Sequence, residues 1–268
     1  MPEMLEAEMA RAVIEQRAVG RRIARVVAPD AWYLKRGLTA AAAAEALTAR
    51  GFATARRTGK QLLLDTSGVG RRRTPGPVLG LHLGMSGRVV VDGESAGDPL
   101  LYASNAENPA WLRFGVEFAD GGSLWLRDPR RLGAVELDPD ESRLGPDAAT
   151  LDRRALGRAI GKSVAPLKAV LMDQSRIAGL GNLLTDEVLW RAGLDPAREA
   201  RGLDEEERAA LARTIRHTVR LLGKRGGSHT GDLQASRERG GRCPRDGAEL
   251  LRRTVGGRTT YSCPLHQR

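Results

Sequence analysis

The chain has 268 residues, with 43 Lys or Arg against 33 Asp or Glu, so its formal net charge is +10. Most of the basic residues are arginines, and such a balance favours a polyanionic partner. Only two cysteines occur, which excludes a disulfide-rich scaffold, and no apolar run is long enough to cross a bilayer. Residues 1–30 carry acids and arginines throughout, so we expect a cytoplasmic protein without a secretory signal.

The chain begins with Met-Pro-Glu, followed by a second acid at Glu6. If Met1 is removed, Pro2 presents a secondary amine, and α-amino groups have a pKa of about 8, so part of this amine is an unprotonated nucleophile at neutral pH. Glu3 beside it can move protons, so the two residues suit covalent catalysis. The same residues also suit the start of an ordinary helix.

The first half of the chain changes from helical to strand periodicity. Residues 3–19 predict a helix with Ala10, Val13 and Ile14 on one face, and a second helix begins at the N-cap Thr39 and stops at Gly51. Short strands broken by glycine then follow, and residues 52–68 predict a hairpin that turns at Thr58-Gly59.

A second hairpin has the clearest alternation of apolar and polar residues. In residues 111–128 the apolar side chains on one face of the first strand are Leu112, Phe114, Val116 and Phe118, and an Asp120-Gly121 turn leads to the returning strand. Residues 1–137 therefore predict a helix-flanked antiparallel β-domain with two packed sheets.

Beyond residue 137 the strand pattern disappears. Residues 138–150 are acidic, polar and turn-rich, so we interpret them as a linker. Four helical segments follow at 152–162, 166–174, 182–193 and 204–224, and the last has Leu211, Ile215, Val219 and Leu222 at helical spacing. We expect a helical domain over 151–226, and then a Gly/Arg-rich loop and a cysteine-containing tail over 227–268.

The most informative stretch is LKAVLMDQSRIAGLGNLLTDEVLWRAGLDP, residues 167–196. Two helices are joined by a loop in which Gly179 and Gly181 permit tight turns. Asn182 stands where the next helix begins, so its side chain and the nearby N–H groups predict an anion cradle, to which Lys168 adds a positive charge. A helical hairpin that is merely packed by its leucines fits the same glycines.

This stretch resembles the helix-two-turn-helix signature of the formamidopyrimidine-DNA glycosylase/endonuclease VIII family of base-excision repair enzymes. Other motifs follow in that family's order over the whole chain: Pro-Glu-x-x-Glu at residues 2–6, TGKQLLL, LHLGMSG, DPRRLG and GGRTTYSCPLHQ. The resemblance implies an α+β fold, with an N-terminal helix-flanked antiparallel β-sandwich. It also implies a C-terminal helix-two-turn-helix bundle that carries a zinc-finger-like β-hairpin.

The resemblance also implies a bifunctional DNA glycosylase/AP lyase. In this family the proline amine attacks C1′ of the damaged nucleoside, and β- and δ-elimination then cleave the strand. Pro2 would be the nucleophile, Glu3 the proton donor to the sugar ring oxygen, and Glu6 would help to position the site. Lys60 would contact phosphate near the lesion.

The implied partner is double-stranded DNA that contains oxidised bases or abasic sites, bound by a nucleoid-associated monomer. Asn182 and Arg258 would grip the phosphates beside an extruded nucleotide, with help from Lys168. Because the damaged nucleotide must leave the base stack, Met85, Arg130 and Leu132 would fill the gap.

The tail departs from the two Cys-x-x-Cys pairs that hold Zn²⁺ in the family. Here the pairs are Cys243-x-x-Asp246 and Cys263-x-x-His266, and all four residue types can ligate zinc tetrahedrally. We expect a structural zinc ion. His229 as the fourth ligand and a hairpin without zinc are the alternatives, and a disulfide is disfavoured in a reducing cytoplasm.

Two features leave the choice of base open. Leu132 stands where the formamidopyrimidine-type enzymes carry an aromatic wedge, and the segment before Cys243 is shorter than their lesion-covering loop. LHLGMSG and DPRRLG nevertheless favour the formamidopyrimidine/8-oxoguanine type. The alternatives are an endonuclease VIII-like preference for oxidised pyrimidines and a non-catalytic damage binder. A helix-turn-helix transcription factor is disfavoured, because Asp186 and Glu187 make the helix after Asn182 too acidic.

Overall fold

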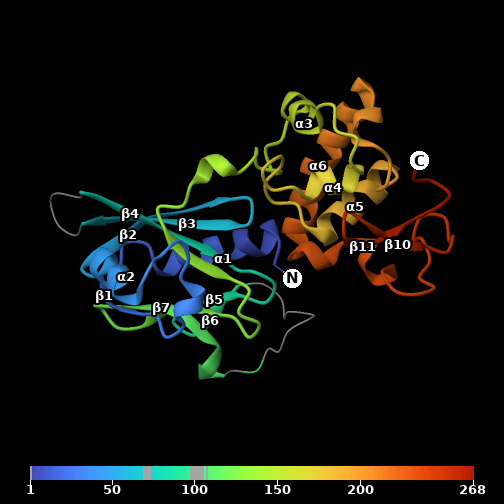
Figure 1. Cartoon of the computed structure of the whole chain (residues 1–268). Helices are drawn as coiled ribbons and strands as arrows, with labels where there is room; N and C mark the ends of the chain where they lie inside the picture. The colour runs from blue at the N-terminus through green and yellow to red at the C-terminus, as the bar shows by residue number, and fades with distance from the viewer. Residues whose placement is uncertain (1, 69–73, 97–105, 107) are drawn as a thin grey trace. The chain divides into compact units, whose positions relative to one another are not determined.

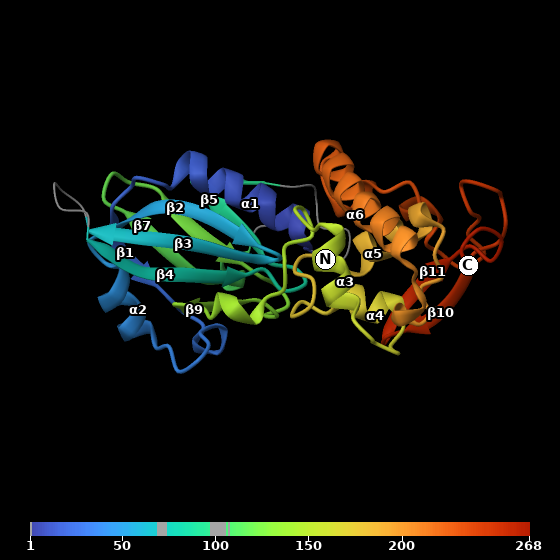
Figure 2. The same cartoon turned by 90° about the horizontal axis from the view of Figure 1, so that it is seen from above.

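The computed structural model describes residues 2–68, 74–96, 106 and 108–268. The chain forms two compact units, shown in Figures 1 and 2. The first unit contains Pro2 and Glu6–Glu141, and the second contains Glu3–Leu5 and Ser142–Arg268. The short stretch that carries the candidate acid Glu3 therefore belongs to the second unit, although the rest of the N-terminal helix belongs to the first.

The first unit combines helices with two antiparallel sheets. The helices are α1 (Met4–Arg17) and α2 (Ala40–Leu47). One sheet has the order β2-β3-β4-β9, and Figure 2 shows β2, β3 and β4 side by side. Its strands are Arg50–Thr58, Gln61–Gly68, Pro75–His82 and Ala134–Leu137.

The second sheet of this unit has the order β1-β7-β8-β5-β6. Its strands, in chain order, are β1 (Ile23–Val27), β5 (Arg88–Val91), β6 (Glu94–Ser95), β7 (Leu112–Phe118) and β8 (Ser123–Arg127). The predicted alternation holds for Phe114, Val116 and Phe118, which are buried in one core with Ala10 and Ile14 of α1. Leu112 is half-buried and does not belong to this core, because the register of the strand pair shifts between Leu112 and Phe114. The expected arrangement of two sheets flanked by helices is confirmed.

Two boundaries differ from the sequence prediction. Thr39 is the N-cap of α2, as expected, but the helix ends at Leu47 and not at Gly51, because the chain reverses at Ala49 (φ 66°) and β2 begins at Arg50. The β2–β3 turn consists of Gly59 and Lys60, since Thr58 already pairs with Gln61. The start and the pairing of β2 therefore set both boundaries, which are the end of α2 and the position of the β2–β3 turn.

The second unit is helical. Its helices are α3 (Arg153–Ile160), α4 (Leu167–Met172), α5 (Asn182–Ala192) and α6 (Glu205–Arg225), as the four segments predicted. All four apolar residues expected on one face of α6 are buried. A capping box between Asp204 and Glu207 starts this helix.

Part of the predicted linker is a packed part of the second unit. Ala148 is fully buried, and its N–H donates to the Ala178 carbonyl at 2.9 Å. The division between the units falls after Glu141. Residues 145–151 are therefore ordered by contacts that their polar sequence does not reveal.

The tail is an antiparallel hairpin of β10 (Leu251–Val255) and β11 (Arg258–Ser262). It packs through its own small core, which joins Tyr261 and Leu250 to Trp190 of α5 and to both cysteines. Over the described part of the chain, no helix combines the length and apolar character that a membrane span needs.

Candidate active site

Glu3 is completely buried at the start of α5. Its Oε2 accepts hydrogen bonds from the backbone N–H groups of Gly181 at 3.0 Å and Leu184 at 3.1 Å, and its Oε1 accepts from Leu183 at 2.8 Å. The first N–H groups of a helix have no partners within the helix, and they form the positive end of its dipole. Glu3 is therefore a buried carboxylate whose negative charge is compensated by backbone donors.

The glycines of the preceding loop make this contact possible. Gly179 has φ +116°, and a Cβ there would lie 2.9 Å from the sulfur of Met4. A Cβ on Gly181 would lie only 2.3 Å from the carboxyl carbon of Glu3. Gln174 holds the loop in shape, since its amide accepts from the Gly179 N–H and donates to the Leu180 carbonyl, each at 2.9 Å. The two glycines are thus required by close packing against residues 3 and 4.

The expectation that Asn182 caps an open anion cradle is wrong. Gly181 is the N-cap residue, and the cradle holds the carboxylate of Glu3. The Asn182 side-chain amide instead donates to the Thr259 carbonyl of β11 at 3.2 Å. This contact places Asn182 beside Arg258, the exposed first residue of β11. Their contact with DNA phosphates stays a prediction.

Lys168 also differs from its predicted role. Its side chain is fully buried, and Nζ donates to Asp186 Oδ1 and Thr260 Oγ1, each at 2.7 Å. The other Asp186 oxygen pairs with Arg237 at 3.1 Å. Burial lowers the pKa of Lys168 and raises that of Asp186, while their mutual attraction opposes both shifts. Lys168 therefore joins α4 and α5 to β11 and does not present its charge to a ligand.

In the first unit, the loops of the LHLGMSG and DPRRLG motifs are tied together by the buried carboxylate of Asp128. Its Oδ2 accepts from the N–H groups of Leu132 and Gly133, each at 2.8 Å. Its Oδ1 accepts from the Arg130 N–H at 3.1 Å and from the hydroxyl of Ser86, in the other loop. Sequence reasoning did not assign a role to Asp128, although it is the first residue of the DPRRLG motif.

Close packing supports the same pairing of loops. A Cβ on Gly84 would lie 2.3 Å from the backbone carbon of Leu132, so the loop that carries Met85 and the loop that carries Arg130 and Leu132 touch directly. Tyr33 donates to Asp128 from below at 3.1 Å, and burial next to that carboxylate raises the pKa of Tyr33 above its usual range. Leu132 is 48% exposed, and its entry into a base stack stays a prediction.

Of the remaining predicted residues of the first unit, Lys60 lies at a chain reversal, Glu6 in α1 and Pro2 just before α1. Lys60 is half-buried in the β2–β3 turn, and Glu6 is half-buried in the first turn of α1. His82, which sequence reasoning passed over, ends β4 opposite Gln61, and its Nδ1 accepts from the Gly84 N–H at 3.1 Å. Pro2 is buried, and Met1, whose removal the mechanism requires, lies outside the described residues.

The four predicted metal ligands meet at one point of the tail. Ligand atoms of Cys243, Asp246, Cys263 and His266 all lie within 4.8 Å of one another. The Cys243 sulfur is 3.8 Å from His266 Nδ1, and the Cys263 sulfur is 3.2 Å from Asp246 Oδ2. Both cysteines are free, so the disulfide alternative is wrong. This set can hold a metal ion without His229.

Hydrogen bonds with surrounding groups hold these side chains in positions that suit metal binding. The N–H groups of Arg245 and Leu265 donate to the sulfurs of Cys243 and Cys263, each at 3.4 Å, and the Trp190 indole donates to Cys243 at 3.2 Å. Nε2 of His266 lies 3.2 Å from the Trp190 carbonyl, so a proton on Nε2 leaves Nδ1 free to ligate. Such outer contacts are typical of metal sites, and the residues present fit one.

Comparisons with known proteins agree with this geometry. Residues 1–135 match the family described as "Formamidopyrimidine-DNA glycosylase N-terminal domain", and residues 144–232 match "Formamidopyrimidine-DNA glycosylase H2TH domain". The chain is 36% identical to a formamidopyrimidine-DNA glycosylase of Cereibacter sphaeroides and 34% identical to one of Paracoccus denitrificans, with 100% of each chain covered.

Solved structures show the same likeness. A Lactococcus lactis Fpg complex with DNA that contains an oxidised pyrimidine has a TM-score of 0.81 and 28% identity. A complex of the L. lactis G226P mutant with Fapy-dG-containing DNA has a TM-score of 0.81 and 27% identity. Both comparisons cover 100% of each chain. The chain therefore belongs to the formamidopyrimidine-DNA glycosylase family.

Proposed function

We propose that this family member releases oxidised bases from duplex DNA and then cleaves the abasic strand, with Pro2 as its nucleophile. One observation carries the proposal: the carboxylate next to Pro2 in the chain, that of Glu3, is buried on three backbone N–H groups at the start of α5. A carboxylate that is fixed so rigidly beside a secondary amine is suited to proton transfer.

The hydrogen bonds to Glu3 dictate the order of the proton steps. They favour its ionised form, so Glu3 begins as a carboxylate that can take the proton of the Pro2 ammonium and, once protonated, readily gives that proton up. The nitrogen lone pair then attacks C1′, and the bond between C1′ and the base breaks, so that the base leaves with that electron pair. The attached nitrogen loses its own N–H proton, which the leaving base takes up. The nitrogen lone pair then expels the ring oxygen from C1′, and Glu3 returns its proton to that oxygen. An iminium links Pro2 to the opened sugar.

Strand cleavage follows from the iminium. Its positive charge acidifies the C2′ proton, so a base removes that proton and the 3′ phosphate leaves by β-elimination. A second elimination then releases the 5′ phosphate. Glu6, in the first turn of α1, is the carboxylate that we assign to positioning the opened sugar.

The loops organised by Asp128 supply the groups that replace the extruded nucleotide. Because Asp128 accepts from backbone N–H groups of one loop and from the Ser86 hydroxyl of the other, it holds Met85, Arg130 and Leu132 close together in the first unit. Lys60 and His82 supply polar contacts to phosphate in that unit, and Asn182 and Arg258 supply them in the second.

Borohydride trapping tests the covalent step. The purified chain is incubated with a duplex that contains an abasic site, and the iminium is reduced. We expect a stable adduct on Pro2, located by mass spectrometry, and none with Pro2→Gly. An unmodified chain, or a mature protein that retains Met1, would leave the proposal untenable.

The preferred base is a separate part of the proposal. The loops LHLGMSG and DPRRLG support a formamidopyrimidine/8-oxoguanine preference, whereas the exposed aliphatic Leu132 favours oxidised pyrimidines as the second candidate. A release assay with each lesion opposite each normal base separates them. Faster release of Fapy-guanine and 8-oxoguanine than of oxidised pyrimidines supports the first, and the reverse order supports the second.

We propose zinc as the metal of the tail. Two sulfur ligands, one imidazole and one carboxylate form a borderline-soft donor set that matches Zn²⁺, which would stiffen the hairpin that carries Arg258. Metal analysis should find one zinc ion per chain, and His266→Ala should lower that content. Full zinc occupancy in this variant would exclude His266 as a ligand.

A further inference from the structure

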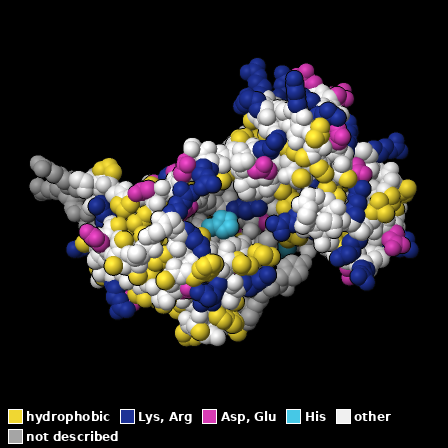
Figure 3. Space-filling view, viewed as in Figure 1, with side chains coloured by type: hydrophobic (Ala, Val, Ile, Leu, Met, Phe, Trp, Pro, Cys, Tyr) yellow, Lys and Arg dark blue, Asp and Glu magenta, His cyan; other side chains and the backbone are white. Residues whose placement is uncertain are grey.

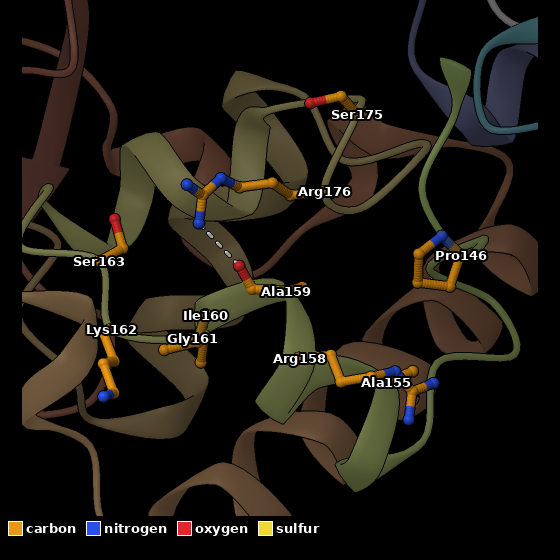
Figure 4. Close-up of a pocket in the computed structure, with 10 residues that line it drawn as sticks. All are labelled: Pro146, Ala155, Arg158, Ala159, Ile160, Gly161, Lys162, Ser163, Ser175 and Arg176. Atoms are coloured by element: carbon orange, nitrogen blue, oxygen red, sulfur yellow. Dashed lines mark hydrogen bonds between the residues drawn. The ribbon is translucent and has the colours of Figure 1, made fainter. Parts of the chain in front are cut away.

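Lys and Arg side chains are spread over the surface of both units, dark blue in Figure 3, so a positive charge alone does not mark a site. A cavity of about 700 Å³ in the second unit is an example (Figure 4). The charged ends of Arg158 and Lys162 point apart there, and Arg176 is bound to the Ala159 carbonyl at 2.8 Å. In the first unit, by contrast, two arginines converge on the carboxylate of Asp30.

Asp30 binds Arg131, the residue between Arg130 and Leu132 in the DPRRLG motif. Its Oδ2 accepts from Arg131 Nε at 2.7 Å, and its Oδ1 accepts from Arg131 Nη2 at 2.6 Å. Such a paired contact fixes the direction of the guanidinium as well as its distance. The Asp30 side chain is only 9% exposed, and the hydrogen bonds from Arg131 lower its pKa. Asp30 is therefore an ionised anchor with little access to water.

A second arginine joins Asp30 to the start of the same motif. Arg113 donates from Nη1 to Asp30 Oδ2 at 3.3 Å and from Nε to the Asp128 carbonyl at 2.8 Å. Asp128 is the first residue of the motif, and its side chain binds the backbone N–H groups of Arg130 and Leu132, on either side of Arg131. Asp30 is thus connected to the motif at its first residue and at its centre.

Arg131 has a backbone conformation that an arginine rarely adopts. Its φ is +55°, in the left-handed region, where the Cβ of any residue other than glycine lies too close to the following carbonyl oxygen. A residue is held there only where its surroundings over-determine the conformation, and such residues cluster at functional sites. The paired contact with Asp30 supplies such a constraint. Because the chain turns at Arg131, this conformation fixes the spacing of Arg130 and Leu132, which are both exposed.

We infer that Asp30 is a positioning residue for the side chains that replace an extruded nucleotide. It holds Arg131 in the left-handed conformation, so Arg130 and Leu132 are arranged before DNA binds. This inference rests on the proposed role of Arg130 and Leu132 in filling the gap. When the contact with Asp30 is lost, the loop leaves this conformation part of the time. The apparent affinity for an abasic duplex then falls with the fraction of molecules that keep the conformation.

The test is a ratio of two affinities measured at one salt concentration, for a duplex with a non-cleavable abasic analogue and for the same duplex intact. Phosphate contacts contribute to both affinities, so effects of charge largely cancel and the ratio reports the filling of the gap. Retained affinity for the intact duplex also shows that a variant is folded. Asp30→Asn removes the charge of the anchor and keeps its shape. We expect it to lower the ratio by about three- to tenfold.

Two substitutions of Arg131 separate backbone conformation from charge. Arg131→Ala and Arg131→Gly both remove the guanidinium, but only glycine adopts a positive φ without a steric cost. We therefore expect Arg131→Ala to lower the ratio as Asp30→Asn does, and Arg131→Gly to retain a higher ratio than Arg131→Ala. When Asp30→Asn is added to Arg131→Gly, it should change the ratio no further.

Arg36 provides a matched control in the same unit. Its φ is also +55°, it is exposed to a similar extent, and it pairs with Glu136 at 2.6 Å, but it lies outside the DPRRLG motif. Arg36→Ala should leave the ratio unchanged. Leu132→Ala is the reference for the loss of a gap-filling side chain and should lower the ratio.

A parental ratio in Asp30→Asn, together with a lowered ratio in Leu132→Ala, would overturn the inference and leave the proposed function standing. A parental ratio in Leu132→Ala would remove the gap-filling role and the inference with it. Equal ratios in Arg131→Gly and Arg131→Ala would also overturn the inference, because the conformation of Arg131 would then not be what Asp30 controls.

Discussion

At the scale of single residues, Glu3 shows how backbone N–H groups compensate the energetic cost of a buried charge. An isolated buried carboxylate is unstable, but three N–H groups at a helix start compensate this one. The same contacts restrict which side chains fit here. Both carboxylate oxygens of Glu3 act as acceptors, and a methyl group on Gly181 would collide with Glu3.

The first prediction concerns the charge of Glu3. In Glu3→Gln the amide NH₂ faces N–H donors, so we expect base excision to fall by about 10²–10⁴ and stability to fall by about 1–3 kcal/mol. Trapping at a preformed abasic site should fall less, because the opened sugar needs no ring protonation. Single-turnover assays with saturating protein measure both steps.

Glu8→Gln is the matched control, since Glu8 pairs with Arg11 and Arg57 in the first unit. Parental excision by Glu3→Gln would exclude Glu3 as the proton donor.

The second prediction concerns the buried pair of Lys168 and Asp186. Lys168→Met leaves Asp186 buried with Arg237 as its remaining ion pair, so we expect a loss of about 3–5 kcal/mol in the free energy of unfolding. Lys168→Gln should lose less, because its side-chain amide can still donate a hydrogen bond towards Asp186. Urea unfolding measures both variants, and equal losses would contradict the assigned pairing.

At the scale of elements, the β10–β11 hairpin is bound to the helices by polar contacts. Lys168 of α4 and Asn182 of α5 both reach the Thr259–Thr260 backbone or side chains, directly after Arg258. A Cβ on Gly256 in the hairpin turn would lie 2.8 Å from the Ala169 side chain. These contacts fix where Arg258 stands relative to the start of α5.

The third prediction uses two arginines of this hairpin. The register pairs Arg258 with Val255 and Arg252 with Tyr261, so the two arginines lie on opposite faces. Arg258→Ala should weaken binding to every duplex and lower the salt slope by about one, because it removes the proposed phosphate contact. Arg252→Ala is the control and should leave the slope unchanged. Equal effects would show that Arg258 acts only through net charge.

At the scale of the whole molecule, each unit has its own core and its own ion pairs. In the first unit Arg56 of β2 binds Asp65 of β3 and also Glu141, with N–O distances of 2.8–3.0 Å. The hydrogen bonds from Arg56 hold the pKa of Asp65 below its ordinary value. This pair therefore ties the middle of the sheet to the end of the unit.

The fourth prediction is the pH dependence of this ion pair. Because the pKa of Asp65 is lowered on folding, its stabilising contribution is present above the unfolded value of about 4 and is lost as the pH falls through the folded value. Asp65→Asn should cost about 0.5–1 kcal/mol at pH 7, since Arg56 is partly exposed and screened. Urea unfolding should show this difference shrinking towards pH 3, and a constant difference would contradict it.

The sequence by itself determined the features that depend on neighbouring residues. Alternation predicted β7, helical spacing predicted the buried face of α6, and short ligand spacings predicted the cluster of Cys243, Asp246, Cys263 and His266. The motifs also predicted the family. Each of these signals is a short pattern, or a set of short patterns in a fixed order, so no knowledge of which distant residues meet was needed to recognise it.

The tertiary structure alone decided which groups share a site. Glu3 meets Gly181 across 178 positions, Lys168 meets Thr260 across 92, and Asp128 meets Ser86 across 42. Such pairs leave no periodic signal, because only chain folding brings their atoms together. For this reason the sequence predicted an anion in the cradle that Glu3 fills. It also predicted that Lys168 contacts a ligand, although Lys168 is buried and pairs with Asp186.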